Sequence, residues 1–261
     1  LDRAAQTFAR VLPALAYLMP DFHNPTGRSM TPAAVAALVD GAQRAGTYLV
    51  LDETTAGLDI DRETAGTAFP EAPRIIRVGS LGKTVWGGLR VGWVRAEADI
   101  VRRLASGRPV HDLGTPEFEQ AVAARVVGRL DEISAQRADL LRAGRDALTR
   151  ALEATFPEWE IPVARGGVSL WVGIGEPVST PLVMNARARG LLLSAGSRFA
   201  VDGGHDRRLR LPFTAAPHTL ERAVGILRAA WDDVRGTSAT ASLDDLAAAL
   251  DEVLAGKPVS V

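Results

Sequence analysis

The sequence predicts an α/β fold, with part of a large domain built on a mostly parallel sheet and a smaller α+β domain after it. Short apolar runs at 15–19, 48–51 and 75–78 are typical of buried strands, and a helical pattern separates the first two. With 261 residues, 47% of them hydrophobic, the chain can bury more than one core. Later patterns predict strands at 168–172, 191–193 and 209–213 and helices at 181–189 and 217–234.

The first helix has clear start and stop signals. Thr31 and Pro32 form an N-cap and first-turn pair, and Gly46 supplies the stop. Apolar residues recur between them at helical spacing, namely Val35, Leu38, Val39 and Ala42. These signals predict a helix that connects the first two strands.

A second Thr-Pro pair, Thr115 and Pro116, opens a long helical pattern that we expect to run past Gly144 to about Leu152. Small residues at 236–241 indicate a linker, and Ser242 resembles the start of a last helix. The predicted division is 1–110 for the large-domain part, 111–152 for an interdomain helix, 153–235 for the small domain and 236–261 for linker and terminal helix.

Composition excludes several classes of protein. The formal net charge is −1 without a basic block, so we expect no nucleic-acid contact from this segment. No apolar run approaches the ~20 residues of a membrane span. Cysteine is absent, which excludes disulfides and thiolate metal sites and fits the cytoplasm. Because the chain opens with Leu1 in what reads as the middle of a fold, we expect an N-terminal truncation.

Lys83 is an unusual residue in this chain, because only two of the 30 cationic residues are lysines. It lies in a glycine-rich turn directly after the third predicted strand. An amine can lose its proton and attack a carbonyl carbon to form a Schiff base, whereas a guanidinium stays protonated. Lys83 is therefore a candidate for a covalent role, with an ordinary loop lysine as the alternative.

Polar residues follow each of the three predicted parallel strands. They are Asn24 in an Asn-Pro-Thr-Gly turn, Asp52 and Ser80. Ligands bind at the carboxyl ends of the strands in open α/β sheets, so these residues are expected to share one edge with Lys83. Each is also an ordinary turn or loop residue when it stands alone.

The turn around Lys83 differs from a nucleotide-binding phosphate loop. That motif needs a glycine five positions before Gly82, where this chain has Arg77. The sequence therefore argues against an NTPase.

Four stretches together resemble a known family: 20–27 (PDFHNPTG), 51–53 (LDE), 79–92 (GSLGKTVWGGLRVG) and 209–213 (LRLPF). Over nearly its whole length the chain resembles the fold-type-I, class I/II aminotransferases that depend on pyridoxal 5′-phosphate (PLP). Within them it is similar to the aminotransferase domain of MocR-type (GntR family) transcription regulators. The resemblance implies a truncated PLP-binding large domain and a homodimer.

The resemblance also implies roles for individual residues. Lys83 would form the Schiff base with PLP and move protons during catalysis. Asp52 would pair with the protonated pyridine nitrogen of the cofactor. Asn24 would donate a hydrogen bond to the oxygen on the cofactor ring.

Three further residues would hold the anionic groups. The resemblance assigns Ser80 and Arg90 to the cofactor phosphate. Arg210 would bind the carboxylate of the substrate through its bidentate fork. The strand pattern of Leu209, Leu211 and Phe213 places Arg210 on the opposite face from these apolar residues, although a solvated arginine cluster is the alternative.

The chain departs from the family at one position near Asp52. A tyrosine usually follows the aspartate by two or three residues, and here those positions are Thr54 and Thr55. PLP binding is therefore better supported than fast transamination. Two functions remain open: a PLP-dependent aminotransferase acting on an amino acid or amine, and the effector-sensing domain of a MocR-type regulator. A PLP lyase or decarboxylase is a third, weaker reading.

Overall fold

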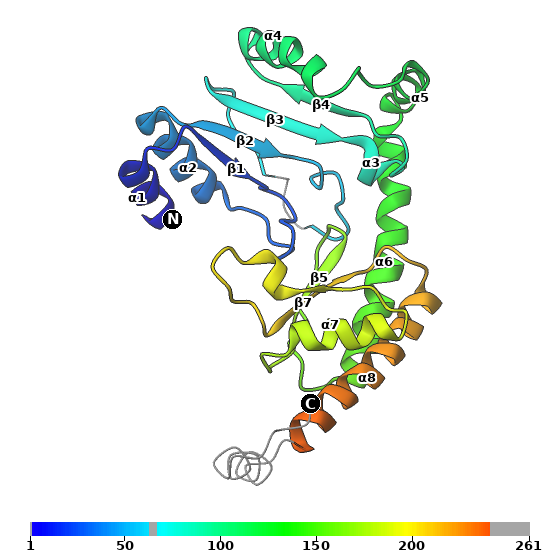
Figure 1. Ribbon diagram of the computed structural model, residues 1–261. Coiled ribbons are helices and arrows are strands. Elements are labelled where there is room, and N and C mark those ends of the chain that lie inside the picture. The colour runs from blue at the N-terminus through cyan, green and yellow to red at the C-terminus, as the bar shows by residue number, and fades with distance from the viewer. Residues whose placement is uncertain (1, 63–66, 241–261) are drawn as a thin grey trace. The chain divides into compact units, whose positions relative to one another are not determined.

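A computed structural model describes residues 2–62 and 67–240 of the chain (Figure 1). The chain divides into two compact units. The first comprises Leu1–Arg145, Val163–Leu170 and Pro212–Thr214, and the second comprises Asp146–Pro162, Trp171–Leu211 and Ala215–Val261. In the described ranges, no helix has both the length and the apolar character that a membrane span requires.

The first unit contains a four-stranded sheet in the order β1-β2-β3-β4 (Figure 1). Strands β1 (Leu15–Leu18), β2 (Tyr48–Asp52) and β3 (Ile75–Ser80) are parallel, as the three apolar runs predict. Strand β4 (Gly92–Arg95) pairs antiparallel with β3 and was not predicted. Its four residues are all exposed, so β4 lacks the apolar alternation that identifies a half-buried strand.

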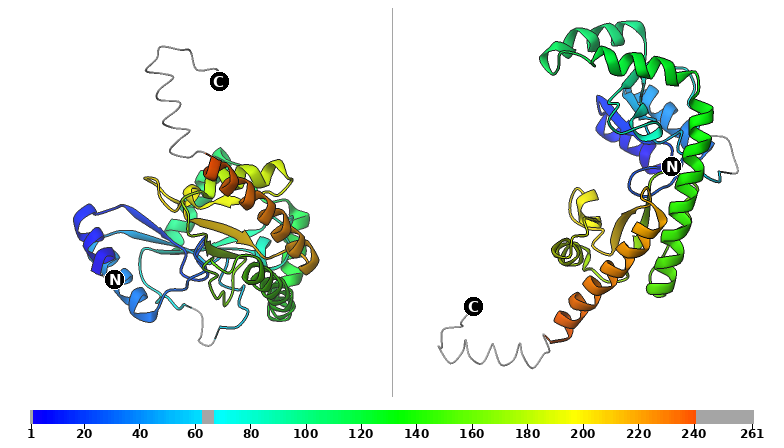
Figure 2. Two further views of the ribbon diagram at one scale, coloured as in Figure 1. Left: turned by 90° about the horizontal axis from the view of Figure 1, so that it is seen from below. Right: turned by 90° about the vertical axis from the view of Figure 1, so that its right-hand side faces the viewer.

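Helix α2 (Pro32–Ala45) forms as its caps predict. Thr31 Oγ1 accepts a hydrogen bond from the Ala34 amide at 3.2 Å, and Gly46 adopts a left-handed φ of 68° at the other end. Helix α1 (Asp2–Val11), which was not predicted, lies beside α2 (Figure 2). Phe8 of α1 joins the core between α2 and the sheet, whose buried members include Val35, Leu38, Leu49 and Leu51.

The long helix expected from Thr115 to Leu152 is two helices. Helix α5 (Glu117–Val127) is capped by Gly128 at its C-terminus, and helix α6 (Leu130–Thr155) begins two residues later. Glycine is a poor helix former, which explains the interruption at this position. Thr115 does not cap α5, because the N-cap position is Pro116; the Thr115 hydroxyl instead accepts a hydrogen bond from Arg108 at 3.1 Å. The expected continuation past Gly144 is confirmed.

Three shorter elements complete the first unit: α3 (Leu81–Thr84), α4 (Ala98–Gly107) and the 3-10 helix η1 (Arg108–Val110). Helix α3 follows β3 without a gap, so the residue that ends the strand, Ser80, also caps the helix. This junction places Lys83 at the edge of the sheet.

The second unit has a three-stranded sheet in the order β5-β7-β6, formed by β5 (Ser169–Gly173), β6 (Ser194–Ala195) and β7 (Arg208–Pro212). Two strand predictions are confirmed, but the strand expected at 191–193 is wrong, because pairing with β7 begins at Ser194. Helices α7 (Ser179–Ala188) and α8 (Pro217–Thr240) lie side by side, and a 3-10 helix η2 (Gly196–Phe199) follows β6. Phe156, Trp159 and Trp231 form an aromatic core, with the first two rings stacked at 3.9 Å.

The linker expected at 236–241 is wrong over 236–240, where α8 continues to Thr240. This stretch contains no proline, and helix formation tolerates single glycine and β-branched residues. The last helix expected from Ser242 lies outside the described residues. The domain boundaries at 110, 152 and 235 stay predictions.

Candidate active site

Lys83 lies in α3, immediately beyond the carboxyl end of β3. Its side chain is exposed, and its Nζ donates a hydrogen bond to Thr54 Oγ1 at 2.8 Å. Thr54 follows β2, so this contact joins the ends of two neighbouring parallel strands. The expectation that Lys83 and the Asp52 region share one edge of the sheet is met by this geometry.

Asp52 ends β2 and is buried, with 7% of its surface exposed. Its Oδ1 accepts a hydrogen bond from the Thr54 amide at 2.8 Å, and its Oδ2 accepts one from the Tyr17 hydroxyl. Burial by itself raises the pKa of this carboxyl. The hydrogen bonds from Thr54 and Tyr17 and the charge of Lys83 outweigh burial, so the pKa of Asp52 lies below its usual range. Asp52 is therefore an ionised carboxylate at neutral pH.

Tyr17, in β1, is a site residue that sequence reasoning missed. Burial and the hydrogen bond to Asp52 raise the pKa of its phenol to about 12, so the hydroxyl stays protonated and donates. The strand pattern alone could have indicated that Tyr17 lies near Asp52. Tyr17 pairs with Val50, and Val50 and Asp52 lie on the same face of β2 because they are two residues apart.

We expect Tyr17→Phe to raise the pKa of Asp52 by about one unit, because the carboxylate loses a donor that favours its charged form. The folded-state pKa lies below the unfolded value, so the Asp52 contribution to stability is present above the unfolded pKa. It is lost as pH falls through the folded pKa, and the variant should lose less stability on acidification.

Carbon-13 NMR titration of the Asp52 carboxyl measures this pKa directly. Tyr48→Phe is the matched control, since Tyr48 lies in β2 and its ring contacts Arg74 instead of Asp52. Equal Asp52 pKa values in the two variants would contradict the assigned hydrogen bond.

Ser80 and Arg90 lie on either side of the turn that carries Lys83. Ser80 Oγ accepts a hydrogen bond from the Gly82 amide at 3.0 Å and donates one to the Val91 carbonyl at 3.4 Å. Arg90 is exposed, and its guanidinium has no ion-pair or hydrogen-bond partner within residues 2–62 and 67–240. A guanidinium and a hydroxyl are both groups that bind phosphate oxygens.

Asn24 is exposed and lies in the turn after β1. Its backbone N–H donates to Met19 Sδ at 3.0 Å, and its peptide bond to Pro25 is cis. In the described part of the chain, its side chain makes no hydrogen bond. The preceding residue, His23, contacts Thr26 Oγ1 through Nδ1 at 2.9 Å, and burial lowers the pKa of this histidine. Asn24 thus follows the carboxyl end of β1, and its side-chain amide is free of partners among the described residues.

A buried ion pair anchors this turn and was also missed from the sequence. Asp21 and Arg62 have side chains that are 4% and 8% exposed, and Oδ1 lies 2.8 Å from Arg62 Nη1. The Asp21 carboxylate also accepts hydrogen bonds from the amide and hydroxyl of Thr67. Its carbonyl accepts one from Thr55 Oγ1 at 2.7 Å. Asp21 therefore ties the turn of Asn24 to the loop that follows Asp52.

The adjacent aromatic residue, Phe22, lies against a glycine pair in the segment that precedes β5. A Cβ at Gly166 would lie 2.3 Å from Phe22 Cζ and 2.6 Å from the Leu58 carbonyl oxygen. Gly167 has a φ of 82° and lies close to Phe22 as well. The ring needs the space that these two glycines leave.

Arg210 belongs to the second unit, where it lies in β7 between the buried Leu209 and Leu211. It is half-buried, and burial lowers the pKa of its guanidinium. Its Nε is buried and makes no hydrogen bond within the described residues. The alternation of the strand therefore separates Arg210 from the apolar face as expected, and one of its donors has no partner.

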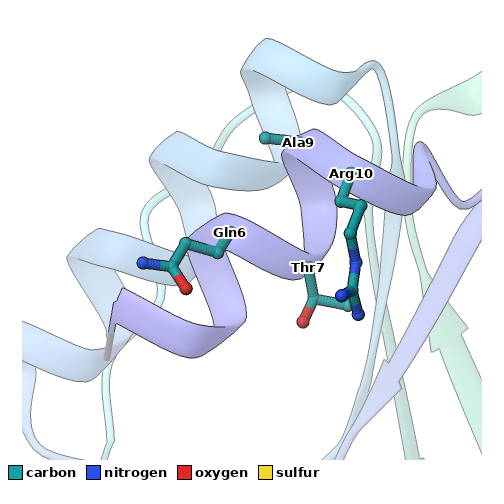
Figure 3. Close-up of a pocket in the computed structure, with 4 residues that line it drawn as sticks. All are labelled: Gln6, Thr7, Ala9 and Arg10. Carbon is teal, nitrogen blue, oxygen red and sulfur yellow. The ribbon is translucent and has the colours of Figure 1, made fainter.

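Two surface pockets of the first unit lie elsewhere. One is lined by Gln6, Thr7, Ala9 and Arg10, all from α1 (Figure 3). The other is lined by residues of β4, α4, η1 and the turn after η1. Neither is lined by Lys83 or Asp52. Among the described residues, no cluster of His, Cys, Asp and Glu suits a metal ion.

The sequence model of the family described as aminotransferase class I and II matches residues 18–227. The chain belongs to this family. It is 30% identical over 211 residues to the aromatic-amino-acid aminotransferase 1 of Thermococcus litoralis, covering 78% of this chain and 50% of the relative. It is 28% identical over 216 residues to the HTH-type transcriptional regulator YdfD of Bacillus subtilis, covering 77% and 43%. The chain thus spans about half the length of the curated aminotransferase it matches.

Solved structures of aminotransferases have the same fold. The multiple substrate aminotransferase of Thermococcus profundus is 26% identical with a TM-score of 0.78, covering 89% of this chain and 60% of that one. LysN, an α-aminoadipate aminotransferase of Thermus thermophilus, is 23% identical with a TM-score of 0.80, covering 90% and 63%. The fold is therefore the fold type I of PLP-dependent aminotransferases, and PLP is the cofactor of this family.

The residues of the first unit fit this cofactor chemically. Each Asp52 oxygen accepts one hydrogen bond from the chain and has a second lone pair available for a pyridine N–H. Lys83 offers an exposed amine for an aldehyde carbon, and Arg90, which has no partner among the residues that the structure describes, offers its guanidinium for a phosphate. These residues therefore match the ring nitrogen, the aldehyde and the phosphate of PLP.

Proposed function

We propose that the protein is a PLP-dependent aminotransferase that moves an amino group from an amino acid to a 2-oxo acid. The observation that carries this proposal is the hydrogen-bonded path from Lys83 Nζ through Thr54 to the ionised Asp52. This path connects Lys83, which would bind the cofactor covalently, with Asp52, which would pair with the protonated ring nitrogen of the cofactor. By analogy with its family, the protein would work as a homodimer, and a chain without cysteine suits the cytoplasm.

The residues of the chain have separate tasks in this proposal. Lys83 would hold PLP through Nζ and would move a proton to and from the substrate carbon. Asp52, kept ionised by Thr54 and Tyr17, holds the ring nitrogen in its protonated form. When bound, PLP supplies an electron sink for the bonding pair released at that carbon.

The remaining candidates act by binding. Ser80 and Arg90 hold the phosphate, and Asn24 orients the cofactor through its ring oxygen. Arg210, whose Nε has no partner in the described part of the chain, binds the carboxylate of the amino acid. None of these tasks needs a metal ion.

A second function is favoured by one observation, the similarity to HTH-type regulators such as YdfD. In that case the chain is the effector-sensing domain of a MocR-type regulator, and the same residues bind PLP and a ligand amine. Turnover separates the two functions. An aminotransferase converts amino acids to 2-oxo acids over many cycles. A sensor domain that binds a ligand amine changes the absorption spectrum of the cofactor once and forms no further product.

The cofactor assignment is tested by incubating the purified protein with PLP, reducing it with borohydride and mapping the labelled peptide by mass spectrometry. We expect the pyridoxyl group on Lys83 alone, because its amine is hydrogen-bonded to Thr54 and its charge acts on Asp52. Lys257, the other lysine of the chain, is the internal control on the same molecule. Label on Lys257 alone, or on neither lysine, would contradict the proposal.

A further inference from the structure

The hydroxyl of Thr54 occupies a position between the two principal groups of the candidate site. Its own amide donates to Asp52 Oδ1 at 2.8 Å, which fixes the backbone of Thr54 relative to the carboxylate. Its Oγ1 accepts a hydrogen bond from Lys83 Nζ, also at 2.8 Å. The carboxylate thus orients Thr54, and Thr54 in turn holds the amine of Lys83.

The neighbouring Thr55 has a different environment. Thr55 is 2% exposed, and its hydroxyl donates to the Asp21 carbonyl at 2.7 Å. That hydroxyl holds the loop to the Asn24 turn and makes no contact with Lys83. Of the two threonines that stand where the resemblance leads one to expect a tyrosine, only Thr54 contacts the lysine.

We propose that Thr54 is a positioning residue that acts on the nitrogen of Lys83, both in the free amine and after the cofactor is attached. This inference rests on the proposed function. A nitrogen that carries a proton donates to Thr54 Oγ1, so the threonine favours the protonated form at this atom. The short side chain of Thr54 contacts the lysine nitrogen directly. Thr54 therefore influences the protonation of that nitrogen.

The test uses the purified, PLP-loaded protein and the pH midpoint of the visible absorption of the bound cofactor. Thr54→Val removes the acceptor while keeping the branched shape, so the protonated form loses a partner and the midpoint should fall by about one pH unit. Thr54→Ser restores the hydroxyl and should return the midpoint to that of the parent. Thr54→Ala removes the same acceptor with a smaller side chain and should give the same midpoint as Thr54→Val. It replaces Thr54→Val in the test if that variant does not fold.

Thr47→Val is the matched control. Thr47 is a buried threonine in the same unit, directly before β2, and its hydroxyl donates to the Pro13 carbonyl at 2.6 Å. This variant loses the hydrogen bond of a threonine hydroxyl away from Lys83, so any effect of a threonine-to-valine change on folding alone appears in it. We expect its absorption midpoint to equal that of the parent.

A second measurement needs no turnover. At a PLP concentration below saturation, borohydride trapping gives the fraction of Lys83 that carries the cofactor, with Lys257 as reference. Because Thr54 accepts from the protonated nitrogen both before and after attachment, Thr54→Val should leave this fraction within about twofold of the parent. A several-fold loss of label would contradict this role and indicate that Thr54 acts on attachment instead.

The outcomes separate the inference from the proposed function. A parent protein that takes no label on Lys83 overturns the proposed function itself. A labelled parent whose absorption midpoint is unchanged in Thr54→Val and Thr54→Ala overturns the role of Thr54 alone. A Thr54→Ser variant that behaves like Thr54→Val also overturns it, because a hydroxyl would then not be the group that matters.

Discussion

Lys83→Ala is expected to abolish covalent attachment of PLP and to lower the rate of amino-group transfer at least ~10⁴-fold. The alanine removes both the nitrogen that attaches the cofactor and the base that moves the proton. The measurement is single-turnover conversion of an amino acid panel by the PLP-loaded protein, followed through the cofactor absorption. Lys83→Arg should be equally inactive, since a guanidinium keeps the charge but stays protonated and cannot attack an aldehyde.

Lys257→Ala is the matched control for this result. It removes the other lysine of the chain and should leave attachment and rate at the parental level. A Lys83→Ala protein that retains a borohydride-reducible cofactor, or a Lys257→Ala protein that loses it, would show that Lys83 is not the attachment residue. Circular dichroism of each variant establishes that the fold is kept.

Asp21→Ala is expected to lower the free energy of unfolding by about 3–5 kcal/mol. The substitution leaves the guanidinium of Arg62 buried without its nearest carboxylate, and it removes the acceptor of both Thr67 hydrogen bonds. Asp59, whose carboxylate lies 2.9 Å from Arg62 Nε, remains as a partial partner and places the expected value toward the lower end. Urea unfolding of parent and variant measures the difference.

Asp40→Ala is the control for an exposed pair. Asp40 and Arg44 lie within salt-bridge distance in α2, with side chains that are 59% and 65% exposed, and such pairs contribute about 0.5 kcal/mol or less. If Asp21→Ala lowered the free energy of unfolding no more than Asp40→Ala does, the buried pair would not be what stabilises the Asn24 turn.

The parts of the fold that sequence predicts well are those with a strong local pattern. The three parallel strands and the capped helix α2 depend on neighbouring residues, and both caps formed as expected. The edge shared by Asp52, Ser80 and Lys83 follows from these strands, because polar residues at the ends of parallel strands meet at one side of a sheet.

The missed features depend on contacts between distant residues. Asp21 meets Arg62 and Thr67 across 41 and 46 positions, and no local pattern encodes that choice of partner. Strand β4 exists because β3 offers it a backbone edge, and its own residues carry no alternation. Strand β6 began later than its apolar run, since pairing with β7 and not hydrophobicity set its position.

The close approach of Gly166 to Phe22 has a consequence for mutational tolerance. Gly166 bears no functional group, yet even the methyl group of alanine would overlap the phenyl ring and the Leu58 carbonyl. Phe22 is two residues before Asn24, so a displaced ring would move that turn as well. In a saturation library selected for a working protein, position 166 should therefore accept glycine alone, while an exposed charged position such as Asp40 accepts most residues.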